Sequence, residues 1–472
     1  MRMRTSISLA AILLACAGAA QAQPQSPRPD QAAFREIYRE MVETNTTRSV
    51  GSCTALAEKV EKRLLDAGLP RADVRVVASP VDPRWGSLTA VFRGSDPKAK
   101  AMLLLAHIDV VEANRADWVR DPFTLVEENG VFYGRGSSDD KAQAAVWVDS
   151  FIRFRKAGFK PRRDIKMALT CGEETPETFN GVEWLLANAR ELVDAEFALN
   201  EGAGGLLDAA GNRVALNVQG GQKVYQDFKL EASGPGGHSS LPSRDNVIYR
   251  LSAAALRIGD HNFPVELNDA NRGYFTGMAD LVGGEAGAAM RAVVKDPNDT
   301  AAVATLSKNL SWNSMLRTTC VATTVQGGHA PNALPQRVAI NVNCRMFPGH
   351  PVEEIRAQLE RVVADPQVKV TVVPPESPTP PAPRLTERVM DPIRKAAAKA
   401  WPGVPVIPVL SPGATDGRFL TAAGIPTYGV TGFFHSPTGP NAHGLNEHIS
   451  VRSLMEGRDF LHDLVQIYAL QK

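Results

Sequence analysis

Long apolar stretches, blocks of like charge and cysteines are all scarce in this chain of 472 residues. Apart from one apolar stretch near the N-terminus, no segment is long enough to cross a bilayer, so the rest of the chain predicts no transmembrane helix. The formal net charge of +1 argues against binding to nucleic acid or to an anionic membrane. The length instead fits a globular protein with one large domain and a smaller one.

Two common hydrolase signatures are also absent. The sequence contains no Gly-x-Ser-x-Gly motif, which serine hydrolases of the α/β class need for their nucleophile. It also lacks the His-Glu-x-x-His motif of the zincin metalloproteases. Glycines precede a predicted helix at residues 134–136, but their spacing is that of neither a P-loop nor a dinucleotide-binding motif.

The N-terminal residues have the pattern of an export signal. Arg2 and Arg4 precede an apolar stretch at residues 7–17, and the small residues around Ala22 form a cleavage site. We therefore predict a signal peptide that ends near Ala22 and a periplasmic or secreted mature protein. A less favoured alternative is a lipoprotein signal, in which Cys16 would carry the lipid.

Export would remove Cys16 and leave four cysteines in an oxidising compartment. Cys320 and Cys344 lie on two strand-like stretches that can pair antiparallel, and we predict a disulfide between them. For Cys53 and Cys171 a disulfide and two buried free thiols both remain open.

Three predicted strands end at side chains that can bind a metal. These are His107 after strand 101–106, Glu173 and Glu174 after strand 164–169, and Glu201 after strand 195–199. Open α/β sheets bind ligands at the carboxyl ends of their strands, so we expect these side chains to lie close together. Asp109 is placed to accept a hydrogen bond from the second ring nitrogen of His107 and thereby fix its tautomer.

Two further candidates lie on loops. Asp139 follows the glycines at 134–136, and His443 precedes the predicted final helix 451–470. With the strand ends they give five ligands without a thiolate: His107, Asp139, Glu174, Glu201 and His443. Such a set suits two zinc ions that share Asp139, and it leaves Glu173 free to act as a general base.

The pattern of elements changes in the middle of the chain. Predicted strands at 223–232, 317–325, 337–347 and 368–373 are joined by helices at 247–255 and 351–364, an order typical of an α+β domain with an antiparallel sheet. Between them, residues 260–313 form a long polar stretch with several glycines. A proline-rich linker at 374–381 returns the chain to the first domain.

The predicted fold class is therefore α/β, with a mostly parallel central sheet in a catalytic domain and an inserted α+β domain. The predicted boundaries are 1–22 for the signal peptide, 23–218 and 375–472 for the two parts of the catalytic domain, and 219–374 for the insertion.

Taken together, six motifs resemble the M20 family of metallopeptidases and deacylases. They are residues 107–111, 134–141, 173–174, 200–202, 237–239 and 443–447, in the family's order. The resemblance implies that His107, Asp139 and Glu201 hold one zinc ion, and that Asp139, Glu174 and His443 hold the other; cobalt or manganese are possible substitutes. It further implies that Glu173 is the base and that a cis peptide joins Asp139 to Asp140.

The same resemblance makes the inserted domain a lid that often mediates dimerisation. His238 would stabilise the oxyanion, commonly from the partner subunit, or from its own chain by closure of the lid. Asn332, Arg345 and Gly413 would bind the substrate, with Arg345 on its carboxylate. The long segment 260–313 is more similar to carboxypeptidase S and its relatives that hydrolyse N-acyl amino acids.

The expected function is hydrolysis of an amide bond next to a free carboxylate, as in a carboxypeptidase that acts on short peptides. The alternative within the family is an N-acyl-amino-acid deacylase, which uses the same zinc chemistry. From a different class, the alternative is a non-catalytic binding protein on the hydrolase fold, which the presence of all five ligands and Glu173 disfavours. A homodimer through the lid is the expected assembly.

Overall fold

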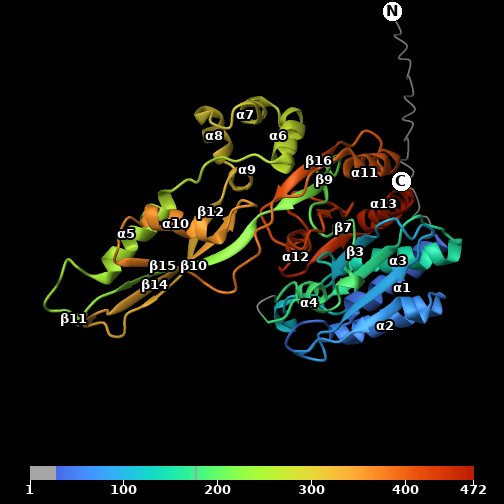
Figure 1. Ribbon diagram of the computed structural model, residues 1–472, viewed down its shortest axis with the longest axis horizontal. Coiled ribbons are helices and arrows are strands. Elements are labelled where there is room, and N and C mark those ends of the chain that lie inside the picture. Colours follow the sequence, from blue (N-terminus) through green and yellow to red (C-terminus); the bar gives the residue numbers. More distant parts are fainter. Residues whose placement is uncertain (1–27, 176–177) are drawn as a thin grey trace, which may run out of the picture.

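The computed structural model describes residues 28–175 and 178–472, so the predicted signal peptide and Cys16 lie outside the described residues. Two separate sheets lie at opposite ends of an elongated molecule, and a group of four helices covers the region between them (Figure 1). Within the described residues, no helix combines the length and apolar character that crossing a bilayer requires.

The larger sheet has ten strands in the order β1-β2-β6-β3-β7-β17-β9-β8-β18, with β16 paired to β9. Their bounds are β1 Val74–Val77, β2 Ser87–Phe92, β3 Met102–His107, β6 Ile165–Thr170, β7 Phe197–Asn200, β8 Gly205–Leu207, β9 Arg213–Gln222, β16 Val406–Ser411, β17 Thr427–Gly429 and β18 Phe434–His435. Strands β6, β3, β7 and β17 run parallel at its centre. The prediction of a mostly parallel central sheet is confirmed.

Helices cover both faces of this sheet. One face packs against α1 Pro29–Glu43, α2 Cys53–Asp66, α3 Lys141–Ala157, α11 Glu387–Ala400 and α13 Val451–Leu470, and the other against α4 Gly181–Asn188 and α12 Gly417–Ala422. The position of β3 between two cores explains why its sequence is apolar nearly throughout. Leu104 lies in the first of these two cores and Leu103 in the second, so no position of β3 faces water.

The smaller sheet is antiparallel, in the order β12-β14-β10-β15. Its elements are β10 Val224–Ser233, β12 Thr319–Gly327, β14 Arg337–Met346 and β15 Val368–Val372, with α5 Val247–Asp260 and α10 Val352–Val363 packed on one face. A two-stranded ribbon of β11 Gly237–His238 and β13 Ala333–Leu334 lies at the end that points away from the large sheet (Figure 1). The predicted inserted α+β unit with an antiparallel sheet is thus present.

One buried lysine marks the passage between the two sheets. Strand β9 of the large sheet ends at Gln222, β10 of the small sheet begins at Val224, and Lys223 between them is fully buried. Its Nζ donates to the carbonyls of Ser314 at 2.9 Å and Arg317 at 2.7 Å. Burial lowers the pKa of Lys223 to about 7. The boundary predicted at 218/219 falls within β9.

Residues 260–313, for which the sequence suggests only a polar stretch, are largely helical. They contain α6 Asp269–Val282, α7 Gly284–Lys295 and α8 Thr300–Ser307, and α9 Leu310–Leu316 follows. The helices pack on β9 and β16 around Ile407. Glycines usually argue against a helix, but these allow close packing, because a Cβ on Gly273 or Gly277 would lie only 2.9 Å or 3.2 Å from side chains of β16.

The remaining short elements complete the outline of the fold. A three-stranded sheet is formed by β4 Val126–Glu128, β5 Val131–Tyr133 and β19 His448–Ser450, and single 3-10 turns occur at Arg71–Asp73, Arg115–Asp117 and Arg190–Leu192. Pairing of β19 with β5 brings the loop that carries His443 beside the glycine-containing loop before α3.

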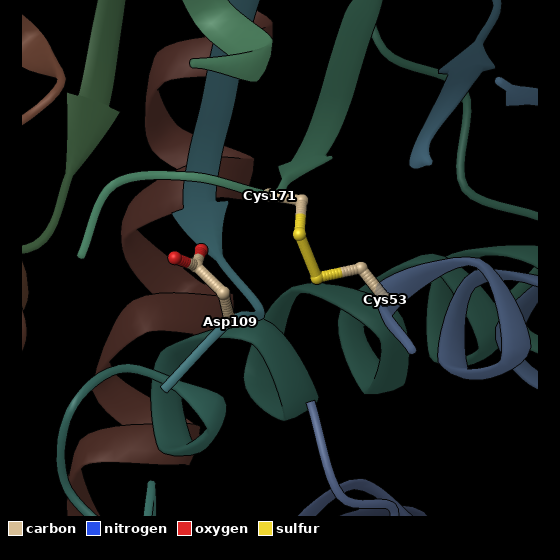
Figure 2. Close-up of side chains that lie close together, drawn as sticks. All are labelled: Cys53, Asp109 and Cys171. Carbon is tan, nitrogen blue, oxygen red and sulfur yellow. A yellow bond between two sulfur atoms is a disulfide. The ribbon is translucent and has the colours of Figure 1, made fainter. Parts of the chain in front are cut away.

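Both possible disulfides are formed. Cys320 and Cys344 are directly opposite each other on β12 and β14, which confirms the predicted cross-strand bond. Cys53, at the start of α2, is bonded to Cys171, directly after β6, as Figure 2 shows. This settles the pairing that the sequence leaves open.

We expect the two disulfides to contribute unequally to stability. The Cys53–Cys171 bond closes a sequence separation of 118 and the Cys320–Cys344 bond one of 24. Since the entropy of loop closure grows with the logarithm of loop length, replacing the first pair by alanines should lower the free energy of unfolding by about 1.4 kcal/mol more than replacing the second. Guanidinium denaturation of the two double-alanine variants measures this, and the reverse order would contradict it.

Candidate metal centre

The central parallel strands bring the predicted ligands to one edge of the large sheet. Because β3 lies between β6 and β7, His107 at its end is flanked by Glu173 and Glu174 on one side and by Glu201 on the other. Asp139 arrives from the loop before α3, and His443 from the loop between β18 and β19. All five predicted ligands meet at this edge.

The five side chains form two groups that share Asp139. In the first group, Nε2 of His107 lies 3.0 Å from Oδ1 of Asp139 and 3.8 Å from an oxygen of Glu201. In the second, Nε2 of His443 lies 3.3 Å from Oδ2 of Asp139 and 3.0 Å from Glu174. Each oxygen of Asp139 therefore faces a different histidine, and each group has its ligand atoms within 4.8 Å of one another.

Electrostatics at this edge favour bound cations. Burial raises the pKa of Glu201 and that of Glu173 well above their usual values, and Oε1 of Glu201 is buried without a hydrogen-bond partner. Hydrogen bonds to Asp139 and Glu174 raise the pKa of His443 to about 10. Buried carboxylates are normally paired with cations or bound to metals. Imidazole and carboxylate are also the ligands that suit zinc and related divalent ions, so the residues present fit a two-metal site.

Asp109 holds the turn that carries the two glutamates. Its carboxylate accepts hydrogen bonds from the backbone N–H groups of Glu173 at 3.3 Å and Glu174 at 3.0 Å. Figure 2 shows this carboxylate pointing away from the Cys53–Cys171 disulfide. The expected bond from its carboxylate to His107 is not formed, because the distance to Nδ1 is 3.8 Å.

The backbone of Asp109 fixes the histidine instead. Nδ1 of His107 lies 3.1 Å from the Asp109 carbonyl oxygen, which can only accept. Nδ1 must therefore carry the proton, and Nε2 is directed at Asp139 and Glu201. The tautomer is thus the one that the sequence predicts, although a carbonyl and not a carboxylate selects it.

Sequence reasoning missed the ion pair that holds the two loops of the site together. Glu447 is fully buried and accepts from the N–H groups of Ser138 at 2.8 Å and Asp139 at 3.0 Å, and its other oxygen accepts from Arg135 at 2.8 Å. Arg135 also donates to the carbonyls of His443 and Gly444. Both residues lie within recognised motifs, and this is the only signal that marked them.

The loop that carries His443 has a backbone that needs this support. Asn441, His443 and Asn446 all have φ between 55° and 60°, in the left-handed region that residues with a Cβ rarely adopt. Strained backbone of this kind persists where surrounding contacts hold it, and Arg135 supplies two of them. The peptide between Asp139 and Asp140 is cis, as the resemblance implies.

The predicted oxyanion residue, His238, and the predicted substrate-binding residues lie on separate elements. His238 and Asn332 lie next to each other at the β11–β13 ribbon, at the far end of the small sheet (Figure 1), where Ser239 N–H donates to the Asn332 carbonyl. Arg345 is at the near end of β14, paired with Tyr225 of β10. Gly413 is in the loop after β16, and its N–H donates to Oγ of Ser411.

The sequence is similar to those of known hydrolases. Human N-fatty-acyl-amino acid synthase/hydrolase PM20D1 is 28% identical over 386 residues, which cover 79% of this chain and 75% of that protein. Carboxypeptidase S of Saccharomyces cerevisiae is 27% identical over 271 residues, which cover 55% of this chain and 47% of that protein.

Solved structures share the fold at lower identity. The M20 family metallo-carboxypeptidase Sso-CP2 of Sulfolobus solfataricus has a TM-score of 0.67 at 18% identity, and the match covers 94% of this chain and 100% of that one. YXEP of Bacillus subtilis, described as a dinuclear metal binding peptidase, has a TM-score of 0.57 at 13% identity over 93% of this chain and 98% of that one. The model of peptidase family M20/M25/M40 matches residues 103–467. The chain therefore belongs to this family of metallohydrolases, as its sequence motifs predict.

Proposed function

We propose that the protein is an exported dinuclear zinc hydrolase that cleaves an amide bond next to a free carboxylate. The observation that carries this proposal is the position of Asp139, whose two carboxylate oxygens face His107 and His443 separately. This is the arrangement that a carboxylate bridging two metals requires. The proposed ligands are His107, Asp139 and Glu201 for one ion, and Asp139, Glu174 and His443 for the other, with cobalt or manganese as possible substitutes.

Glu173 is the proposed general base. Bound zinc ions would supply Lewis acidity, polarising the scissile carbonyl and making water more acidic. Glu173 would take the proton from the attacking water and deliver it to the leaving nitrogen. Burial raises its pKa, which suits a group that must both accept and donate a proton. Asp109 keeps the turn of Glu173 in place through its backbone N–H.

Two substrate classes fit this chemistry, and both release an amino acid with a free carboxylate. A carboxypeptidase would act on short peptides, and a deacylase on N-acyl amino acids. Similarity to the human N-fatty-acyl-amino acid synthase/hydrolase extends over 79% of this chain, and this supports N-acyl amino acids as the second candidate class. Arg345 is the proposed ligand of the carboxylate in both cases.

His238 and Asn332 would complete the site from a second copy of the chain. Strand β10 separates them from the large sheet, and its ten residues span roughly 30 Å. The side chain of His238 is exposed and bonded through Nδ1 to Oγ of Ser240 at 2.7 Å, which leaves Nε2 on the outside. A homodimer through the small sheet is therefore the proposed assembly, with closure of one chain onto itself as the alternative.

The disulfides bear on where the protein works. Cys53–Cys171 and Cys320–Cys344 are bonds that form and persist in an oxidising compartment. Together with the predicted signal peptide they support a periplasmic or secreted protein.

Replacing Glu173 by glutamine should lower kcat by about 10²–10⁴-fold and leave the zinc content unchanged, because only the proton-transferring group is lost. Hydrolysis of a panel of dipeptides and N-acetyl amino acids, with metal analysis of the same samples, measures both quantities. Glu387→Gln is the matched control, since that side chain is 82% exposed. Wild-type activity in Glu173→Gln would refute the assignment.

Zinc binding should release protons at pH 7. In the metal-free protein the pKa of His443 is about 10 and that of His107 is raised by the charges of Glu201 and Asp139 despite its burial, so both rings are protonated. Zinc requires neutral imidazole, so about two protons or more should leave per chain and affinity should rise with pH. Titration calorimetry in buffers of different ionisation enthalpy gives the number. His443→Ala should release about one proton fewer, and binding without proton release would contradict the proposed ligands.

A further inference from the structure

A large cavity separates the small sheet from the helix that follows the Ser411 loop. It has a volume of about 520 Å³ and is lined on one side by Tyr225 and Asp227 of β10, and on the other by Arg418 and Phe419 of α12. The segment 373–378 closes one side. The cavity therefore lies between elements of the two sheets, at the end of the small sheet where Arg345 is found.

One arginine, Arg418, lines this cavity, and a second, Arg345, lies over the ring of Tyr225, which lines it from the small sheet. The guanidinium carbon of Arg345 lies 4.8 Å from the ring centre of Tyr225, and that of Arg418 lies 4.6 Å from the ring centre of Phe419. Arg345 belongs to β14 of the small sheet and Arg418 to α12 on the large one. Each guanidinium thus lies over an aromatic ring, a contact that leaves its N–H groups able to donate to another partner.

Neither arginine has an anionic partner within the part of the chain that the structure describes. No carboxylate oxygen lies within 4.0 Å of either guanidinium there, and Nε of Arg418 is buried without a hydrogen-bond partner. The nearest acid on the sheet, Asp227, accepts hydrogen bonds from Asn341, Asn343 and the Tyr225 hydroxyl instead. Burial lowers the pKa of Arg345, and the charge of Arg418 acts in the same direction. The charges of Asp227 and Asp416 act on Arg345 and Arg418, respectively, but among the described residues neither carboxylate lies within 4.0 Å of its arginine.

Other charged groups at this cavity are carboxylates on its rim. Glu183 of α4 and Glu376 of the 373–378 segment line it, and both are exposed. Because they lie in water, they attract the arginines only weakly.

Arg418 also connects the cavity to the candidate metal centre. It lines a second, smaller cavity of about 30 Å³ together with Asn200, Glu201 and Thr415. Glu201 is one of the five candidate ligands, so the two cavities adjoin at Arg418. Arg418 therefore lies between a candidate metal ligand and the larger cavity.

We propose that Arg418 is a second ligand of the substrate carboxylate, which it binds together with Arg345 from the opposite side of the cavity. This inference rests on the proposed function, which supplies the carboxylate. A carboxylate has two oxygens, and each can accept from a separate guanidinium. It also removes the repulsion between the two cations, so binding ties the small sheet to α12.

The test uses binding, so that it does not depend on turnover. The probes are N-acetyl-leucine and N-acetyl-leucinamide, which differ in the carboxylate, measured by titration calorimetry on the chelated, metal-free mature protein. Arg418→Met should weaken binding of the acid about 10–100-fold and that of the amide less than about twofold, since only the charged hydrogen bonds are lost. Arg418→Lys, which keeps the charge but not the planar fork, should recover part of the loss.

Arg384→Met is the matched control, because that arginine is 85% exposed and paired with Asp269. Equal weakening of acid and amide in Arg418→Met, or no weakening of either, would overturn the proposal, as would a wild-type protein that does not prefer the acid. A preference for the acid that Arg418→Met abolishes, in a protein that hydrolyses nothing when zinc is restored, would uphold this carboxylate site and refute the proposed function instead. If the zinc-loaded protein hydrolyses its substrate but Arg418→Met binds the acid as well as the wild type does, the proposed function stands and this carboxylate site is refuted.

Discussion

The concentration of half-buried carboxylates at one sheet edge is the constraint on which the rest of the structure depends. Asp139, Glu173, Glu174 and Glu201 meet there with only His107 and His443 as nearby cationic partners in the cluster. Carboxylates removed from water are costly unless they are neutralised. Two divalent cations would neutralise this cluster, and the same cations are what hydrolysis of an amide needs. The same two cations would therefore stabilise this edge of the sheet and supply its chemistry.

The fold serves this edge at several levels. Parallel pairing of β6, β3 and β7 sets three strand ends side by side, and helices on both faces bury the strands that lead to them. The Glu447–Arg135 pair then joins the Asp139 loop to the His443 loop, and Asp109 with the nearby Cys53–Cys171 bond anchors the turn of Glu173. Asp139, His443 and Glu174 are thus placed by contacts from segments distant in sequence, which suits a site that must keep its geometry before metal binds.

Much of this site is predictable from sequence because it follows from strand ends. An apolar strand such as 101–106 must be buried on both faces, so the residue after it lies at the edge of the sheet. The role of Glu447 is not predictable in this way, since nothing local says that its carboxylate reaches the N–H groups before α3. The helices within 260–313 are not predictable from the local sequence for a related reason. Their glycines are explained only by close approach to Ile407 and Pro408, which lie more than a hundred residues away.

The two sheets carry different groups of candidate functional residues. The large sheet carries the candidate metal ligands, and the small sheet carries Arg345 beside Tyr225 at its near end and His238 at the distant ribbon. The boundaries 23–218, 219–374 and 375–472 stay predictions, and Lys223 marks where the backbone changes sheets.

The measurement that tests the central claim most directly is zinc stoichiometry by equilibrium dialysis, made on the wild-type mature protein and on Asp139→Asn. If Asp139 bridges two ions, the wild type should bind about two zinc ions per chain, and the variant should lose tight binding of both together. Loss of a single ion in Asp139→Asn, or a wild type that binds none, would contradict a shared carboxylate at the heart of the site.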